Sequence, residues 1–221
     1  MGTLALLLVS GVTTSTASAG GPYWHVGGAR LGQGVAKQIT LQVKGAFVID
    51  SASPVLATEC ASAVSEGATI EGQGQSQGQD KGRFKLTKCM AITENGLCTV
   101  EEPITTSQLK SHLVTFRGGQ KKYADLFEPQ QGVSILAIKI IACGTLTGIY
   151  KVDGSVAAEF LPAEVENQEG LFNFPLIPIN EVFLEQQTKK PELKIGIKKA
   201  EIIAAFGARL ATNERFGVFG T

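Results

Sequence analysis

The sequence lacks an excess of charge of either sign, because 20 lysine and arginine residues balance 20 aspartate and glutamate residues. A neutral chain has no long-range field to attract nucleic acid or an anionic membrane surface. Charged residues make up only 18% of the chain and hydrophobic residues 43%, which favours a packed core over disorder. We therefore expect a globular protein that does not bind nucleic acid.

Long hydrophobic runs are also absent. A membrane-spanning helix needs about 20 consecutive apolar residues. The best internal candidate, Val133 to Ala142, is too short and contains Lys139. We therefore expect no membrane span.

The first residues have the features of an export signal. A short apolar run over residues 4–9 gives way to small and hydroxyl residues and ends in Ala17-Ser18-Ala19. Signal peptidase cuts after such a small-x-small pattern, although here no lysine or arginine precedes the run. We therefore expect residues 1–19 to be a cleaved signal peptide and residues 20–221 to form a single β-rich domain. The expected location is secreted, in the extracellular space or the cell envelope.

The chain has four cysteines and no closely spaced C-x-x-C pair, which argues against a metal site. An even number of cysteines in an exported chain indicates two disulfides. Cys89 ends one predicted strand and Cys98 begins the next, so the preferred pairing joins these two and leaves Cys60 for Cys143. The alternative pairing joins Cys60 to Cys89 and Cys98 to Cys143.

Recognisable catalytic motifs are missing. The only two histidines, His25 and His112, lie in unrelated contexts, and neither accompanies a G-x-S-x-G elbow or a zinc-ligand spacing. The glycine-rich segment 27–34 lacks the order of a phosphate-binding loop, and no aspartate-rich calcium loop is present. We therefore expect no catalytic residue, no metal site and no cofactor.

Paired carboxylates are a further candidate for a catalytic site, because a glycoside hydrolase needs only two of them. The sequence around the candidate pairs favours polar loops or solvated surface over a shared catalytic site. Trp24, the single tryptophan, is interpreted as pinning the first strand and not as a platform for a ligand. The candidate carboxylate pairs are Glu101 with Glu102, Asp125 with Glu128, and Glu164 with Glu166.

The features that are present indicate strands. Alternating or β-branched runs bounded by glycine and proline recur throughout the chain. The dipeptide Asp153-Gly154 between two such runs predicts a two-residue hairpin turn. The predicted fold is all-β, an antiparallel sandwich or barrel stapled by two disulfides. The main strand predictions cover residues 39–43, 47–49, 83–89, 133–143, 149–152, 155–157, 193–197 and 215–219. Two stretches, residues 107–113 and 201–206, are ambiguous between helix and strand, and we expect strands there because the surrounding pattern is of strands.

The layout around the cysteines resembles a group of exported β-rich actinobacterial proteins with four cysteines, for which no activity is established. The resemblance implies a secreted, β-rich protein, and no functional residue can be carried over from it. The residues on which it rests are Trp24 to Leu31, Cys60, Thr87-Lys88-Cys89, Cys98-Thr99-Val100, Cys143 and Val152-Asp153-Gly154-Ser155-Val156.

These observations favour a non-catalytic exported β-domain that acts as a binding or structural module. The sequence does not identify its partner, and a cell-wall glycan and a small ligand are the candidates. The alternatives are a secreted hydrolase with a carboxylate pair that the fold brings together, and a small-molecule carrier. Polar loops around residues 72–79 and 118–122 are the first candidates for a binding face, because loops on a rigid scaffold often carry recognition.

The export signal yields the first prediction. Cleavage after Ala19 leaves Gly20 as the first residue of the mature protein. N-terminal sequencing of protein recovered from outside the cell should begin at Gly20. A sequence that begins at Met1 or Gly2 would refute the prediction.

Overall fold

A computed structural model describes residues 20–52, 55–73, 78–94, 96–115, 122–174 and 191–220. The described chain is 70% strand, its sheets are antiparallel, and its helical content is one 3-10 turn at Gly144–Leu146. The predicted all-β class is thereby confirmed. Within these ranges no helix is long and apolar enough to cross a membrane. The predicted signal peptide, residues 1–19, lies outside the described residues.

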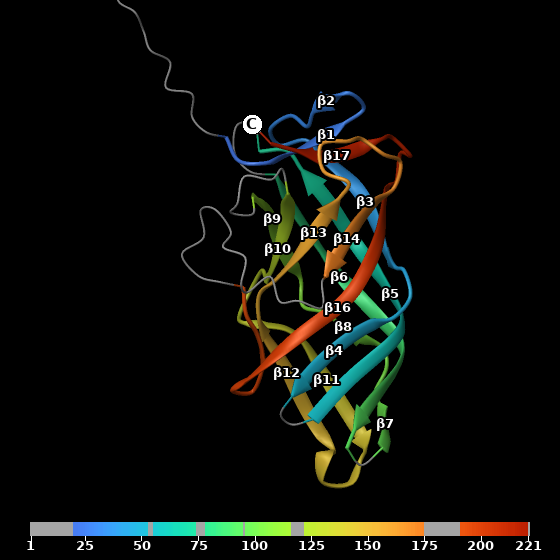
Figure 1. Ribbon diagram of the computed structural model, residues 1–221. Helices are drawn as coiled ribbons and strands as arrows, with labels where there is room; N and C mark the ends of the chain where they lie inside the picture. Colours follow the sequence, from blue (N-terminus) through green and yellow to red (C-terminus); the bar gives the residue numbers. More distant parts are fainter. Residues whose placement is uncertain are drawn as a thin grey trace, which may run out of the picture.

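Three long strands organise the molecule: β5 (Val55–Glu71), β6 (Gln79–Thr93) and β16 (Lys198–Leu210). β5 and β6 form a hairpin whose register runs from Leu56↔Thr93 to Glu71↔Gln79. Each long strand pairs with one set of neighbours along one half and with another set along the other half. The sheet therefore closes twice and forms two barrels, stacked end to end along the long axis in Figure 1.

The first ring of strands, which we call the upper barrel, runs in the order β14-β13-β10-β9-β6-β5-β3 and closes through β16. In β3, inward apolar residues alternate with outward polar ones, and Ile39, Leu41 and Val43 are buried. In β10, by contrast, every residue from Tyr123 to Phe127 is buried. Its remaining strands are β3 (Ala36–Val43), β9 (Leu109–Thr115), β10 (Tyr123–Pro129), β13 (Val156–Leu161) and β14 (Gly170–Phe174).

The second ring, the lower barrel, runs in the order β6-β7-β11-β12-β15-β16-β4 and closes through β5. The short strand β8 (Ile104–Thr105) pairs with β6 beside it. Its remaining strands are β4 (Phe47–Ala52), β7 (Gly96–Val100), β11 (Ser134–Ala142), β12 (Gly148–Gly154) and β15 (Leu193–Ile195).

A small separate sheet covers the open end of the upper barrel, and we call it the cap. It consists of β1 (Tyr23–Val26), β2 (Ala29–Arg30) and β17 (Phe216–Phe219), in the order β17-β1-β2. It lies at the top of the molecule in Figure 1. The C-terminal run therefore forms a strand as predicted, but it joins the cap and not the main sheet.

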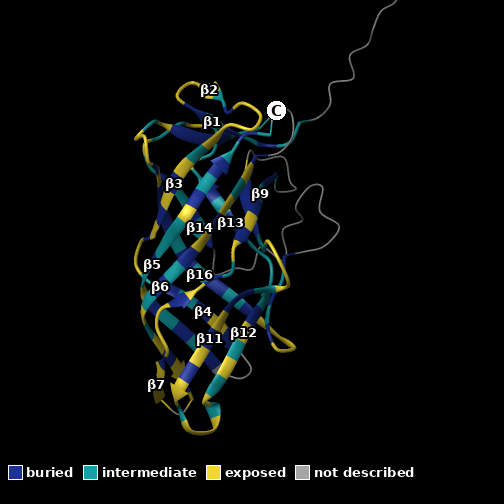
Figure 2. Ribbon diagram, turned by 180° about the vertical axis from the view of Figure 1, so that it is seen from behind, coloured by how far each residue is buried: buried dark blue, intermediate teal, exposed yellow. Residues whose placement is uncertain are grey.

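One hydrophobic core extends through both barrels and reaches the cap. The view by burial shows buried residues along the full length of the strands (Figure 2). In the upper barrel the space is filled by phenylalanine rings in edge-on or tilted contact, such as Phe84 with Phe206 at 5.0 Å and Phe160 with Phe172 at 5.1 Å. The interior of the upper barrel is therefore largely occupied by its own side chains.

The disulfides join Cys60 to Cys89 and Cys98 to Cys143, so the preferred pairing predicted from the sequence is wrong and the alternative is correct. The register of the long hairpin is the reason. Cys60 lies directly opposite Cys89, with 4.0 Å between their Cα atoms, whereas Cys98 lies opposite Ala91. The two bridges are consistent with an extracellular protein.

The predicted hairpin at Asp153-Gly154 is also wrong. β12 pairs with β11 and β15, whereas β13 pairs with β10 and β14, so the two flanking strands are not partners. Gly154 has φ +117°, and a Cβ added there would lie 1.9 Å from the carbonyl oxygen of Glu192. The glycine therefore permits the chain to cross closely past another backbone as it passes from the lower to the upper barrel.

The disulfide topology generates a prediction. Peptide mapping without reduction should recover Cys60 linked to Cys89 and Cys98 linked to Cys143. Replacing Cys60 and Cys89 together by alanine should lower the free energy of unfolding by about 3–4 kcal/mol in the chain-entropy model. Denaturant titration measures this loss, with the double replacement of Cys98 and Cys143 as the matched comparison. A peptide that links Cys89 to Cys98 would contradict the structure.

Candidate functional site

The cap strand β1 presents its side chains to two different environments. Trp24 points into the upper barrel and is completely buried, so the prediction that it pins the first strand is confirmed. Tyr23 and His25, on either side of it, are half-buried on the opposite face of the strand. This alternation creates two candidate sites, one beneath the cap and one on its outer surface.

Beneath the cap, hydrogen bonds connect four elements. The Trp24 indole donates from Nε1 to Asp80 Oδ1 on β6 at 2.7 Å. Ser111 on β9 donates to Asp125 Oδ2 on β10 at 2.8 Å and lies 3.4 Å from Asp80 Oδ2. Two carboxyl groups therefore share one hydroxyl next to an aromatic ring.

Burial raises the pKa of both carboxyl groups. For Asp80 burial is the largest cause, and the charge of Asp125 and a hydrogen bond to it act in the same direction, so its pKa lies well above the usual range. Burial raises the pKa of Asp125 to about 6, against the hydrogen bonds from Asp80 and Ser111. Two carboxylates this close cannot both ionise cheaply, so the pair loses its protons less readily than two isolated aspartates do.

A small pocket adjoins this pair. Its lining is mostly apolar and includes Ile39, Ile70 and Phe84, together with Asp80 and Ser111. About 20 Å³ is open to the centres of water molecules, which is room for about one of them. A sugar ring or a peptide does not fit, so the arrangement favours a structural role for the carboxylate pair over catalysis.

The carboxylates singled out from the sequence have other partners. Glu101 forms an ion pair with Lys139 at 2.5 Å. Glu102 accepts hydrogen bonds from the backbone N–H groups of Lys88 and Cys89. Asp125 and Glu128 both lie in β10, but Asp125 is completely buried, whereas Glu128 is half-buried.

Sequence reasoning missed the pairing of Asp80 with Asp125. The sequence did contain a signal for the burial of Asp125. Asp125 lies on the same face of its strand as Tyr123 and Phe127, which are both buried. An acid at an apolar-face position must be buried and must find a partner there. The partner itself is 45 residues away in the chain and is identified only by the way the barrel closes.

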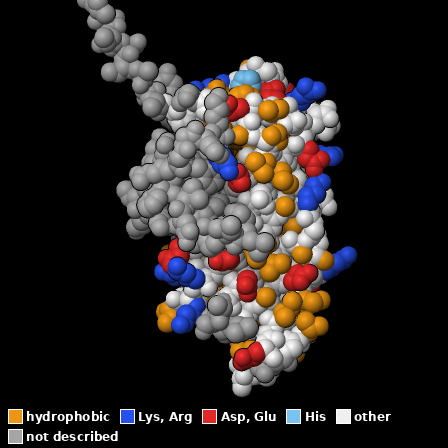
Figure 3. Space-filling view, in the orientation of Figure 1, with side chains coloured by type: hydrophobic (Ala, Val, Ile, Leu, Met, Phe, Trp, Pro, Cys, Tyr) orange, Lys and Arg blue, Asp and Glu red, His pale blue; other side chains and the backbone are white. Residues whose placement is uncertain are grey.

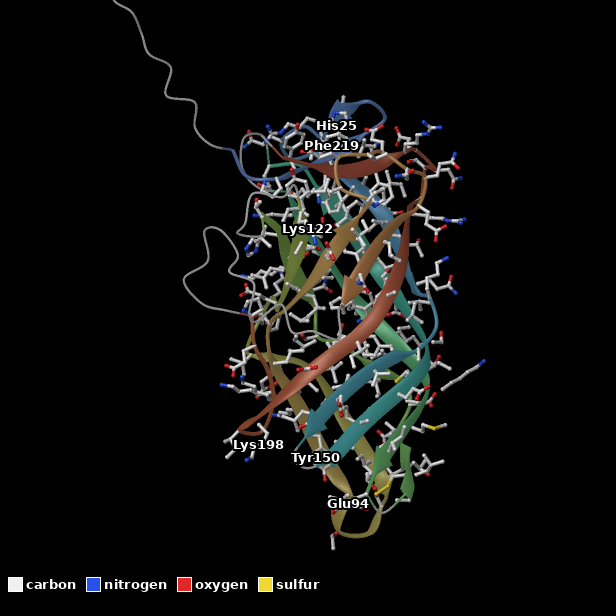
Figure 4. All side chains as sticks on the ribbon, in the orientation of Figure 1. His25, Glu94, Lys122, Tyr150, Lys198 and Phe219 are labelled. Carbon is white, nitrogen blue, oxygen red and sulfur yellow. A yellow bond between two sulfur atoms is a disulfide. The ribbon has the colours of Figure 1, made fainter. Side chains whose placement is uncertain are left out.

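The outer face of the cap carries three rings in a row. Tyr23 and Phe219 lie opposite each other in the ladder and stack, with ring centroids 6.4 Å apart and planes at 23°. His25 lies 4.6 Å from the Phe219 ring, measured between centroids (Figure 4). The Arg30 guanidinium lies 4.1 Å from the centroid of the Tyr23 ring. We call Tyr23, His25 and Phe219 the ring row.

Acidic side chains flank the ring row. Glu166 accepts a hydrogen bond from the Gly28 backbone N–H at 2.9 Å and pairs with His25 Nδ1 at 2.5 Å. Tyr123 donates its hydroxyl to Glu164 at 2.8 Å, and burial, followed by this contact, raises the pKa of Tyr123 to about 12. Histidine, acidic and basic side chains come together at this end in Figure 3.

The loop between β13 and β14 therefore differs from expectation. Glu164 and Glu166 were interpreted as carboxylates of a solvated loop, and that interpretation is wrong for their side chains. Both are half-buried and both make hydrogen bonds to groups of the cap end. The backbone N–H of Glu164 also donates to Val218 of β17, so the loop is attached to the cap.

The other end of the molecule has a different surface. The outward-facing side chains Leu97 and Ile149 are 71% and 65% exposed, and Tyr150 donates its hydroxyl to the Leu146 carbonyl. Tyr150 lies at the opposite end of the molecule from His25 and Phe219 (Figure 4). Of the two loops proposed as binding faces, residues 74–77 and 116–121 lie outside the described residues.

Comparison with known proteins adds no relative: no family model matches the chain, and no curated protein or solved structure is significantly similar to it. Described residues also include no group of three or more histidine, cysteine or acidic side chains that could hold a metal ion.

The buried carboxylate pair generates a prediction with a defined sign. Unfolded aspartates ionise near pH 4, whereas the raised pKa values keep protons on the folded pair, so the folded state binds more protons and stability falls as pH rises. The contribution is complete below about pH 4 and is lost as pH rises through about 6 for Asp125 and through the raised pKa of Asp80.

We expect the free energy of unfolding of the wild type to fall by about 1–3 kcal/mol between about pH 4 and about pH 8, relative to the Asp80→Asn/Asp125→Asn double variant. Denaturant titration at both pH values measures the difference. Asp50→Asn, at an exposed position on β4, is the control and should keep the wild-type slope. Equal slopes in the wild type and the double variant would contradict the prediction.

Proposed function

We propose that the protein is an exported, non-catalytic binding module that acts outside the cell or in the cell envelope, and that it binds a carbohydrate chain on the outer face of its cap. The observation that carries this proposal is the row of three rings, Tyr23, His25 and Phe219, with carboxylates beside it. The partner in view is a cell-wall glycan.

The chemistry of the outer face suits a sugar. One face of a pyranose ring is lined by C–H groups, which pack against aromatic rings, while its hydroxyl groups both donate and accept hydrogen bonds. Phe219 and Tyr23 supply ring surface, and Glu166 and Arg30 supply an acceptor and a donor at either side. A face that combines rings with a few placed polar groups is typical of such sites.

Rigid support strengthens this interpretation. Trp24 anchors the same strand from below, and the β13–β14 loop fixes Glu164 and Glu166 through hydrogen bonds to Tyr123 and His25. Preorganised side chains lose less freedom on binding than mobile ones. The two disulfides fit a protein that works in an oxidising environment.

Two other functions have less support. A hydrolase needs its two carboxylates to reach the substrate, whereas Asp125 is completely buried. A small-molecule carrier needs a cavity of roughly 300–1,000 Å³. The phenylalanine rings of the upper barrel instead leave room for about one water molecule beside Asp80.

Isothermal titration calorimetry of the mature protein with an oligomer of N-acetylglucosamine tests the proposal. We expect saturable binding that Phe219→Ala weakens by about tenfold or more, because that residue contacts both other rings of the row. Tyr150→Ala removes an aromatic ring at the opposite end and should bind as the wild type does.

Two outcomes would refute the proposal. One is the absence of binding to N-acetylglucosamine oligomers and to soluble cell-wall glycan strands alike, with the protein folded by circular dichroism. The other is binding that Phe219→Ala leaves unchanged, which would place the glycan elsewhere on the molecule. Turnover of the glycan, rather than binding alone, would indicate the hydrolase.

A further inference from the structure

His25 presents a half-buried imidazole on the outer face of the cap, beside Phe219 (Figure 4). Its Nδ1 atom lies 2.5 Å from Oε1 of Glu166, and the side chain is 23% exposed. The second ring nitrogen, Nε2, makes no hydrogen bond with another described residue. It is not one of the buried polar atoms that lack a partner, so it is open to solvent. One nitrogen of the ring is therefore held by the protein, and a ligand can contact the other.

Glu166 determines which nitrogen of His25 carries the hydrogen. The backbone N–H of Gly28 donates to both oxygens of the carboxylate, at 2.9 and 3.0 Å, and so holds it in place. An ionised carboxylate only accepts hydrogen bonds, so the nitrogen that faces it, Nδ1, has to donate. A neutral imidazole has a single N–H group, which leaves a lone pair at Nε2. In the neutral ring Nε2 is therefore an acceptor.

Titratable groups approach His25 from three elements. Glu166 comes from the β13–β14 loop, and Arg30 of β2 lies opposite His25 in the ladder. The Tyr23 ring lies 6.3 Å away on β1, and the ladder neighbour on β17 is Gly217, which has no charge. The Arg30 guanidinium lies 4.1 Å from the centroid of the Tyr23 ring and has only donors. A ligand on the ring row therefore meets donors over Tyr23 and an acceptor at His25.

We propose that the ring row binds a sugar that carries an acetamido group, and that neutral His25 accepts the N–H of this group at Nε2. The acetyl methyl group packs against Phe219, the ring next to His25. An amide N–H can only donate, so it needs an acceptor at this place. The inference rests on the proposed glycan site and names the class of sugar that the site takes.

Protonation of His25 reverses the polarity of this contact. A protonated imidazole donates from both nitrogens, so its Nε2–H faces the amide N–H and the two donors repel each other. A sugar hydroxyl can rotate and accept from Nε2 instead. Acid should therefore weaken the binding of an acetamido sugar more than that of a sugar with a hydroxyl at the same carbon. The proton comes from solvent, and no covalent bond of the sugar changes.

The tautomer is tested first, without a glycan. Nitrogen NMR of the mature protein with labelled histidine shows which ring nitrogen carries hydrogen, and His112→Gln assigns the signals because the chain has only two histidines. We expect the neutral His25 ring to carry hydrogen at Nδ1. Glu166→Ala removes the acceptor and should shift the hydrogen to Nε2, the form that an isolated histidine favours. Glu169→Ala, in the same loop but paired with Arg209, is the control and should leave the His25 signals unchanged.

Isothermal titration calorimetry then compares two oligomers of equal length, one of N-acetylglucosamine and one of glucose. Histidine side chains gain their proton between about pH 8 and about pH 5. Over this range we expect the wild type to lose about tenfold in affinity for the N-acetylglucosamine oligomer, and less for the glucose oligomer, because a buried donor loses its acceptor. His25→Phe keeps a ring in the row and should remove this pH dependence.

Glu166→Ala is the second variant in case His25→Phe does not fold. Its neutral ring donates from Nε2, so it should bind the N-acetylglucosamine oligomer more weakly than the wild type at about pH 8 and change less with pH. The inference alone is overturned by hydrogen at Nε2 in the neutral His25 ring, by an affinity that does not change with pH, or by a pH dependence that His25→Phe retains. If neither oligomer binds the wild type, the glycan site is refuted and this inference with it.

Discussion

The register of the long strands is the constraint on which the rest of the structure depends. β5, β6 and β16 are each long enough to pair with different neighbours along their two halves, and the sheet therefore closes into two barrels with one continuous core. Closure leaves few unpaired strand edges, which are a liability in β-proteins. It also determines which residues meet across the interior, including Cys60 with Cys89 and Asp80 with Asp125.

Closure of the upper barrel leaves an open end, and the cap covers it. A sheet of two- to four-residue strands has little stability alone, so it depends on what its inward side chains contact. Trp24 is buried together with Val26, Phe216 and Val218, and it carries one polar atom into the core, where Asp80 accepts its hydrogen bond. A carboxyl group such as that of Asp80 is itself costly to remove from water. It forms a hydrogen-bonded group with the hydroxyl of Ser111 and the carboxyl of Asp125.

The same strand connects the interior to the outer surface. Because side chains alternate along β1, the residue that anchors the cap separates the two that form its ring row with Phe219. Our proposal of glycan binding uses the outer face of this strand, whereas Trp24 on its inner face bonds to Asp80 in the upper barrel. The Asp80–Asp125 pair and the ring row therefore lie at the same end of the molecule.

The sequence by itself determined the strand content, the burial of Trp24 and the number of disulfides, because alternation of polar and apolar residues and an even count of cysteines are local properties of the chain. Strand prediction succeeded even in ambiguous stretches such as residues 201–206, which lie in β16. Only the tertiary structure decided which strands pair. The sequence indicated a hairpin at Gly154, where the chain instead crosses between barrels, and it favoured the wrong cysteine pairing. Asp80 and Asp125 met for the same reason: register and closure are set by contacts between distant segments, which no local pattern records.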